Sequence, residues 1–384
     1  MLEHTPEVID AWAWTIRKRF EGRPVAVGLE LNKGPLVYAL RQYAFLVLFP
    51  IHPLTLAQYR EAFTPSHAKD DPTDAELQLE LLLTHRDTLQ PRNSQSPALR
   101  ALEQLVEHRR RLVGDHVRLT NRLTSALKNY FPHVLQWFDA KDTTIFCDFL
   151  AQWPTLKAVQ LARRTTLEGF FRAHHVRYAD VIDQRLRAIK SATPLTTDEG
   201  LIAPHALLVQ ALVTQLRVTL HAIETFDHAI AQRAQRHPDF PFLAALPGAG
   251  AVFAPRLLVA FGEQRHRYPS ADELQKYAGL APVTERRGNN TWVHWRLQGP
   301  TFLRQTCVEW AAASTPPSFW ARTSYQPQRD KGASHQAAVR ALAFTWSRLL
   351  FRCWQHRTPY EDSVYLNALP RRGSPLIHNL ARGS

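Results

Sequence analysis

Cysteine is scarce in this 384-residue chain, which contains only Cys147, Cys307 and Cys353. The three lie far apart in sequence and form neither a zinc-binding pattern nor a disulfide framework. The 18 histidines show no paired ligand spacing either. A reducing cytoplasm is therefore the expected setting, and zinc-dependent and disulfide-rich secreted classes are disfavoured.

Long apolar runs, repeats and leader-like segments are also missing from the pattern. The opening Met1-Leu2-Glu3-His4 leads into a mixed segment, and the longest apolar run, near residues 44–51, is far too short to span a bilayer. We therefore expect a chain without a membrane partner. Its length is enough to bury a sizeable core in two or three domains.

Acidic residues are outnumbered, with 34 Asp/Glu against 47 Lys/Arg and a net charge of +13. The excess is unevenly placed. Residues 1–90 carry 9 Lys/Arg and 12 Asp/Glu, a net of −3, whereas the other 294 residues carry 38 and 22, a net of +16. An acidic first segment with a basic remainder fits a metal site joined to nucleic-acid-binding parts, although a merely soluble basic enzyme would fit too.

Three carboxylates near the start of the chain are candidates for that metal site. Glu30 ends an apolar strand, and Asp71 and Asp74 lie in the stretch 69–75, KDDPTDA, which follows a second apolar strand and opens an apolar helix. Helical residues three apart share a face, and carboxylates from a strand end and a helix start can converge on Mg²⁺. Such a site would suit phosphodiester chemistry.

The same residues have a structural interpretation. Asp71 followed by Pro72 is typical of a helix N-cap with proline at the first helical position, and Asp74 then complements the exposed amides and dipole of the first turn. A polar residue that ends a strand, as Glu30 does, needs no functional explanation. Spacing alone leaves capping and metal binding both open.

Residues 1–92 are expected to form an α/β domain. Apolar spacing predicts a helix over 6–20, and strands near 25–30 and 45–51 flank a helix near 35–43. This βαβ order favours a parallel or mixed sheet. The polar segment 90–97, QPRNSQSP, is typical of a linker.

Residues 97–238 are expected to be helical. A seven-residue repeat of apolar residues predicts a long coiled-coil helix over 98–130; its positions are Leu105, Leu112, Leu119 and Ala126. The run Arg109-Arg110-Arg111 on this helix is either a solvated face or a face that contacts phosphates. Residues 141–238 show the pattern of further helices.

Residues 239–384 form the third expected domain, which is mostly helical. Its segment Leu246-Pro247-Gly248-Ala249-Gly250 precedes an apolar helix and resembles a helix-hairpin-helix turn. In such a turn Gly248 and Gly250 would let backbone amides approach a phosphate. A plain tight turn between helices is the alternative.

The rest of this domain mixes arginines with aromatic residues. Segment 283–304 holds four arginines, Arg286 and Arg296 among them, together with two tryptophans. Basic residues among aromatics suit contact with nucleic-acid strands. Much of the aromatic content, particularly in the helix expected over 336–354, should nevertheless be core.

Taken in order, these motifs resemble the DEDD-type insertion-sequence transposases related to the Piv DNA invertase, which are RNA-guided recombinases. The resemblance covers almost the whole chain. It is carried by five segments: Val27-Gly28-Leu29-Glu30, KDDPTDA at 69–75, LPGAG at 246–250, YAGLAP at 277–282 and GASHQAAVRA at 332–341.

The resemblance implies a RuvC-like (RNase H-like) α/β domain, a helical coiled-coil insertion and a C-terminal transposase domain. It implies that Glu30, Asp71 and Asp74 are the second, third and fourth acidic residues that bind Mg²⁺. It also implies a serine in the C-terminal domain that links covalently to DNA. The implied partners are DNA, a structured guide RNA and further copies of the chain, in a bacterial cytoplasm and near the nucleoid.

Two positions depart from the family pattern. The first acidic residue is expected on a strand ahead of helix 6–20, where this sequence offers no match, and Asp10 lies within that helix. The serine is expected where Arg287 precedes Gly288, and arginine has no hydroxyl to act as such a nucleophile. The sequence thus favours a transposase impaired in this copy; the alternatives are a non-catalytic nucleic-acid-binding remnant and a RuvC-like nuclease.

Overall fold

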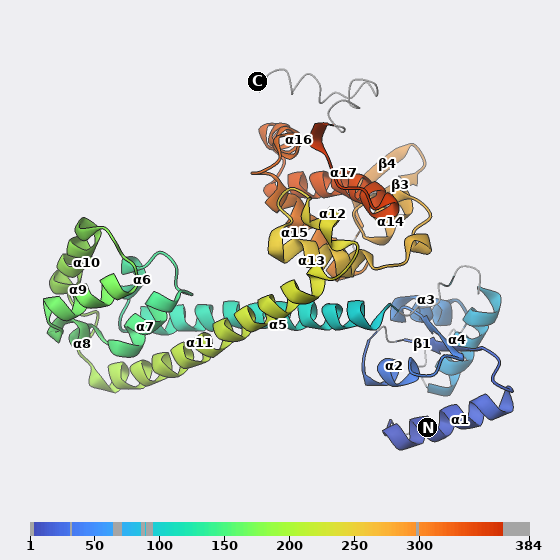
Figure 1. Ribbon diagram of the computed structural model, residues 1–384, viewed down its shortest axis with the longest axis horizontal. Helices are drawn as coiled ribbons and strands as arrows, with labels where there is room; N and C mark the ends of the chain where they lie inside the picture. Colours follow the sequence, from blue (N-terminus) through green and yellow to red (C-terminus); the bar gives the residue numbers. More distant parts are fainter. Residues whose placement is uncertain are drawn as a thin grey trace. The chain divides into compact units, whose positions relative to one another are not determined.

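The computed structural model describes residues 4–30, 33–63, 71–85, 89, 95–296 and 299–363 (Figure 1). The chain divides into two compact units, Met1–Ser96 and Pro97–Ser384. The described residues are mostly helical and contain two small sheets, which agrees with the expected α/β plus helical class. The second and third expected domains both fall within the second unit, and their separation stays a prediction.

The first unit contains a parallel pair of strands, β1 (Val25–Leu29) and β2 (Leu46–Pro50), joined through helix α2 (Pro35–Leu40). The register runs from Val25 opposite Leu46 to Leu29 opposite Pro50. The parallel pairing confirms the βαβ order inferred from the sequence. The other helices are α1 (Pro6–Arg19), α3 (Pro53–Phe63) and α4 (Asp71–Thr84).

Two apolar clusters hold the first unit together. In one, Ile9 of α1 packs with residues of α2 and β2. In the other, Ile51 and Leu56 pack with Leu77 and Leu81 of α4. Helix α4 therefore owes its position to the apolar side of its sequence rather than to capping alone.

Two long helices dominate the second unit, α5 (Pro97–Lys128) and α11 (Glu199–Gln235). They run antiparallel, because Arg109 in the first half of α5 contacts Asp227 near the end of α11, whereas Asn129, just past α5, contacts His205. The long helix expected over 98–130 is confirmed. A coiled-coil supercoil stays a prediction.

Helix α11 is, within the described ranges, the one helix long and apolar enough by length and composition alone to cross a membrane, with a mean hydropathy of 1.4 over 18 residues. The sequence predicted a helix over Leu207–Gln235, and α11 confirms it and begins eight residues earlier, at Glu199. Val209, Leu212 and Leu216 are buried in a core within the second unit. A core helix passes the same composition test, so the test does not by itself indicate a membrane span.

Short helices follow α5 and pack around an aromatic core that includes Phe131, Phe146, Phe149 and Phe171, all fully buried. They are α6 (Val134–Trp137), α7 (Thr144–Gln152), α8 (Leu156–Leu161), α9 (Arg164–Ala173) and α10 (Ala179–Ser191).

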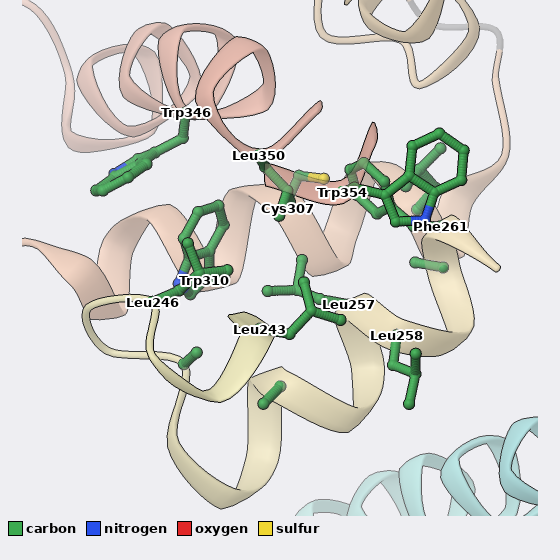
Figure 2. Packing of buried hydrophobic residues seen from close by; sticks show 14 of the residues in the cluster. Leu243, Leu246, Leu257, Leu258, Phe261, Cys307, Trp310, Trp346, Leu350 and Trp354 are labelled. Atoms are coloured by element: carbon green, nitrogen blue, oxygen red, sulfur yellow. The ribbon is translucent and has the colours of Figure 1, made fainter. Parts of the chain in front are cut away.

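The C-terminal part of the second unit has its own core, in which Trp310, Trp320, Trp346 and Trp354 are fully buried; Figure 2 shows part of it. This confirms that much of the aromatic content of helix 336–354 is core, since Trp346 and Trp354 are buried and Phe344 and Phe351 pack against the cluster partly buried. The elements are α12 (Phe240–Ala244), α13 (Gly250–Phe261), η1 (Arg265–Arg267), α14 (Ala271–Tyr277), β3 (Pro282–Arg287), β4 (Asn290–Trp295), α15 (Thr301–Ser314), α16 (Phe319–Asp330) and α17 (His335–His356).

The three cysteines are free and buried in the second unit. Burial raises the pKa of the Cys147 and Cys353 thiols to about 11 and that of the Cys307 thiol to about 12. The thiols therefore stay protonated at neutral pH. The expectation that they form no disulfide framework is confirmed.

Candidate functional site

The end of β1 and one face of α4 build the acidic part of the site. Gly28 lets α4 come close to β1, since a Cβ added there would lie 3.1 Å from Leu82 Cδ1 and 3.4 Å from Gln78 Oε1. Two residues later, Glu30 Oε1 accepts a hydrogen bond of 3.3 Å from Gln78 Nε2. Because Gln78 lies one helical turn after Asp74, Glu30 meets the same face of α4 that carries Asp74.

Asp74 is paired with an arginine that sequence analysis did not single out. Its Oδ1 accepts a hydrogen bond of 2.8 Å from Arg60 Nε and lies 2.5 Å from Arg60 Nη2. The side chains are 13% and 7% exposed, for Arg60 and Asp74 respectively. A buried carboxylate needs such a charged partner, and this role differs from both capping and metal binding.

The three predicted metal ligands do not form one cluster. Asp71, the first residue of α4, is exposed, Glu30 is half-buried and Asp74 is buried. Among the residues described, no group of three or more His, Cys, Asp or Glu side chains is placed to hold a metal ion. Lys69 and Asp70 of the same motif lie outside the described residues. As arranged, the three carboxylates do not fit a Mg²⁺ that all of them would bind.

The arginine run on α5 makes contacts within the second unit. Arg109 forms two hydrogen bonds with the Asp227 carboxylate, of 2.7 and 3.1 Å. Arg110 Nη1 donates to Gln305 Oε1 at 2.7 Å and so ties α5 to α15. Arg111 is 68% exposed and presents the most surface of the three. These pairings give Arg109 and Arg110 structural roles, and phosphate contact by the run stays a prediction.

The Pro-Gly-Ala-Gly turn joins α12 to α13. Gly248 has φ +70°, and a Cβ added there would lie 2.3 Å from the Ala313 carbonyl oxygen. Trp310 Nε1 also donates to the Pro247 carbonyl at 3.0 Å. Gly248 therefore serves the close packing of the turn on α15. Gly250, at φ +48°, has open space around it, and the phosphate-binding role predicted for both glycines is more compatible with Gly250.

A two-stranded antiparallel hairpin, β3–β4, carries the arginine-rich segment. The register pairs Glu285 with Trp292 and Arg287 with Asn290. Gly288 and Asn289 thus form a two-residue turn. Gly288 has φ +58°, as the first central residue of a type II′ turn requires, and such turns match the twist of the strands they join.

The side chains of residues 284–294 of this hairpin face solvent. Glu285, Arg286, Arg287 and Trp292 line an open concave region of about 560 Å³. Trp292 is 49% exposed, and Arg296, which follows β4, is half-buried. Guanidinium groups beside an accessible indole are suited to contact with phosphates and with stacked bases.

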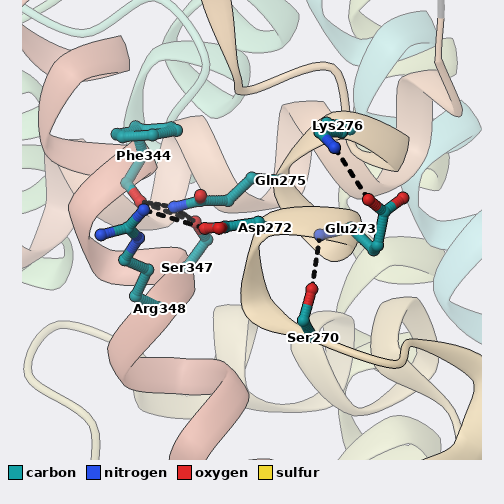
Figure 3. Close-up of polar contacts among 8 residues, drawn as sticks. All are labelled: Ser270, Asp272, Glu273, Gln275, Lys276, Phe344, Ser347 and Arg348. Carbon is teal, nitrogen blue, oxygen red and sulfur yellow. Dashed lines mark hydrogen bonds and ion pairs between the residues drawn. The ribbon is translucent and has the colours of Figure 1, made fainter.

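Helix α14 anchors the start of the hairpin segment on α17 (Figure 3). The buried Gln275 donates to the Phe344 carbonyl at 2.6 Å and to Ser347 Oγ at 3.1 Å. After the hairpin, a Cβ on Gly299 would lie 3.0 Å from the Tyr277 carbonyl oxygen, so the chain returns close to the end of α14. Both ends of the hairpin segment are thereby fixed to the helical core, while its strands stay exposed.

An α/β unit with an acidic strand end and a basic helical unit with an exposed arginine-rich hairpin are features of proteins that act on nucleic acid. Comparison with known proteins identifies the family within this class. Residues 2–132 match the DEDD transposases of the IS110 type, and residues 241–326 match the transposase IS116/IS110/IS902 family. The second match includes the hairpin and the Pro-Gly-Ala-Gly turn.

Relatives along most of the chain agree with these matches. The chain is 30% identical over 347 residues to the "Mini-circle putative transposase for IS117" of Streptomyces coelicolor, covering 88% of this chain and 83% of the relative. It is 26% identical to the IS900 42 kDa protein of Mycobacterium paratuberculosis, covering 84% and 81% of the two chains. The chain belongs to the IS110/IS116 family of insertion-element transposases.

Proposed function

We propose that the chain is a DNA-recombining transposase that binds DNA through the exposed β3–β4 hairpin. The observation that carries this proposal is that the exposed side chains of Arg286, Arg287 and Trp292 line one concave region of the β3–β4 hairpin. Because Arg286, Arg287 and Trp292 are exposed, burial in the core does not account for them. A phosphate backbone with accessible bases complements both the charges and the indole.

Strand exchange by the serine route is, on this proposal, impaired in this copy. Arg287 ends β3 directly before Gly288, at the position where the family resemblance places the nucleophile. A guanidinium cannot attack a phosphodiester as a hydroxyl does. Thr284 and Thr291 carry hydroxyls on the same hairpin and are the residues to substitute if the unmodified chain proves active.

A nucleic-acid-binding remnant is the second candidate, and two observations favour it. The family resemblance expects a nucleophile where this chain has Arg287, and Arg60 pairs with a carboxylate that the metal-dependent route would need. The latter pairing also disfavours a RuvC-like nuclease. A RuvC-like fold for the first unit and Mg²⁺ bound by Glu30, Asp71 and Asp74 rest on the family resemblance alone.

Further copies of the chain are proposed partners, together with a structured guide RNA, in the bacterial cytoplasm near the nucleoid. Self-association is supported by α11, because only 22% of its most apolar 18-residue window is buried. Leu207 and Val218 are 71% and 66% exposed and, eleven residues apart, lie on one face. Replacing both by lysine is expected to lower the sedimentation coefficient of an oligomer to that of the monomer.

Nucleic-acid binding is testable by fluorescence anisotropy with duplex DNA from the element ends and with the element-encoded RNA. Arg286→Ala/Arg287→Ala is expected to weaken binding at least about tenfold and to lower the slope against salt by about one per lost phosphate contact. Arg164→Gln is the control, because Arg164 is 68% exposed but pairs with Glu168. Equal losses of affinity in the two variants would mean that the effect comes from net charge alone. No loss of affinity in either variant would contradict binding through the hairpin.

Strand exchange is testable in vitro with the same DNA ends and RNA. We expect no product from the unmodified chain, and we expect Arg287→Ser to be required for any product. An Arg287→Ala variant controls for loss of the arginine without gain of a hydroxyl. Robust product from the unmodified chain would show that the nucleophile lies elsewhere.

A further inference from the structure

Arg60 of α3 directs its guanidinium at a buried carboxylate of α4. Its Nε and Nη2 both contact Oδ1 of Asp74, at 2.8 and 2.5 Å. One turn before Arg60, Leu56 belongs to the apolar cluster between these helices, as does Leu77, three residues after Asp74. Apolar packing next to the pair limits the access of water and dissolved ions, so the pair is weakly screened.

We propose that Arg60 is the resident cation of this acidic site and takes the place of a divalent metal ion at Asp74. The charges carry the argument. Arg60 neutralises Asp74, and Glu30 has the neutral amide of Gln78 as its hydrogen-bond partner. Asp71 is exposed. The buried charge is thus balanced without a metal ion.

A divalent ion at Asp74 would have to lie within a few ångströms of the guanidinium. At an effective dielectric constant of about 20, like charges at ~4–6 Å repel strongly enough to weaken binding by more than ~100-fold. The site therefore stays closed to divalent ions while Arg60 is in place. Removal of the positive charge, rather than of the side-chain volume, should open it.

The test is Mn²⁺ binding by the purified full chain, followed by the electron paramagnetic resonance of free Mn²⁺. The unmodified chain and Arg60→Lys should show no Mn²⁺ site that depends on Asp74. Arg60→Gln should gain a site that binds Mn²⁺ at least about 100-fold more tightly than the unmodified chain does, and Arg60→Gln/Asp74→Asn should lose it. Arg23→Gln is the matched control, because Arg23 lies in the same unit and pairs with Glu21 but is 79% exposed.

Three results would overturn the proposal. The first is a Mn²⁺ site in the unmodified chain that disappears in Asp74→Asn. The second is a folded Arg60→Gln variant that gains no site. The third applies if Arg60→Gln does not fold without added metal, and it is measured by circular dichroism with added Mn²⁺. Recovery of cooperative unfolding supports replacement of one cation by the other. No recovery contradicts the proposal. None of these measurements involves DNA, so they are independent of the proposed function.

Discussion

The two small sheets of this protein each have two strands, yet their surroundings are opposite. In the parallel pair β1–β2, Leu46 and Leu48 are 7% and 4% exposed and pack into an apolar cluster with α1 and α2. In the antiparallel pair β3–β4, Trp292 and Val293 are 49% and 66% exposed. Packing explains the residues of the first sheet. Packing does not explain Trp292 and Val293 of the second sheet, where Trp292 belongs to the proposed nucleic-acid interface.

The largest expected effect falls on the buried sheet. Leu48→Ala should lower the free energy of unfolding of the first unit by about 2–5 kcal/mol, because it removes a buried side chain and leaves a cavity. Hydrogen exchange read by mass spectrometry over residues 25–50 measures this separately from the second unit. A loss below about 1 kcal/mol would mean that this sheet is not the folded core described.

A smaller effect, on binding rather than on folding, is expected at the exposed sheet. Trp292→Ala should weaken single-stranded nucleic-acid binding by about 1–3 kcal/mol, through lost stacking. The free energy of unfolding should change by less than about 0.5 kcal/mol. Val293→Ala, which alters the opposite face of the same strand, is the control. Equal nucleic-acid affinity of the Trp292→Ala and Val293→Ala variants would show that the exposed sheet does not bind through Trp292.

The smallest effect is expected at the hairpin turn. Gly288→Ala places a Cβ at φ +58° in open space and should destabilise the hairpin by about 1 kcal/mol through backbone strain alone. Gly288→Asn should cost less, because asparagine tolerates positive φ. Faster amide exchange confined to residues 282–295 in the alanine variant would be the signature, and exchange spreading into α15 would argue that the hairpin is part of the core.

Local patterns predicted much of this fold. The helix over 6–20, the strands at 25–30 and 45–51 and the helix over 98–130 follow from apolar spacing, which depends on near neighbours in sequence. The partners of charged groups were not predictable in this way. Arg109 meets Asp227, 118 residues later, and Arg60 meets Asp74 from α3, a helix that the sequence analysis did not assign. Spacing placed Asp74 on α4, but tertiary packing chose its partner.

The role of the glycines in the Pro-Gly-Ala-Gly turn also could not be predicted from local sequence. The pattern was compatible with a phosphate-binding turn and with a plain tight turn, and both require glycine. The contact that distinguishes them at Gly248 is the backbone of Ala313, which lies 65 positions further along the chain. No local pattern carries that information.

The buried cysteines make the chain convenient for site-specific dye attachment. Since the three native thiols are shielded and protonated at neutral pH, maleimide reagents should leave them unmodified while the protein is folded. A cysteine introduced at Asn289, in the hairpin turn, would then be the reactive thiol of an otherwise native chain. A fluorophore there would report occupancy of the hairpin directly, molecule by molecule, without the removal of any core side chain.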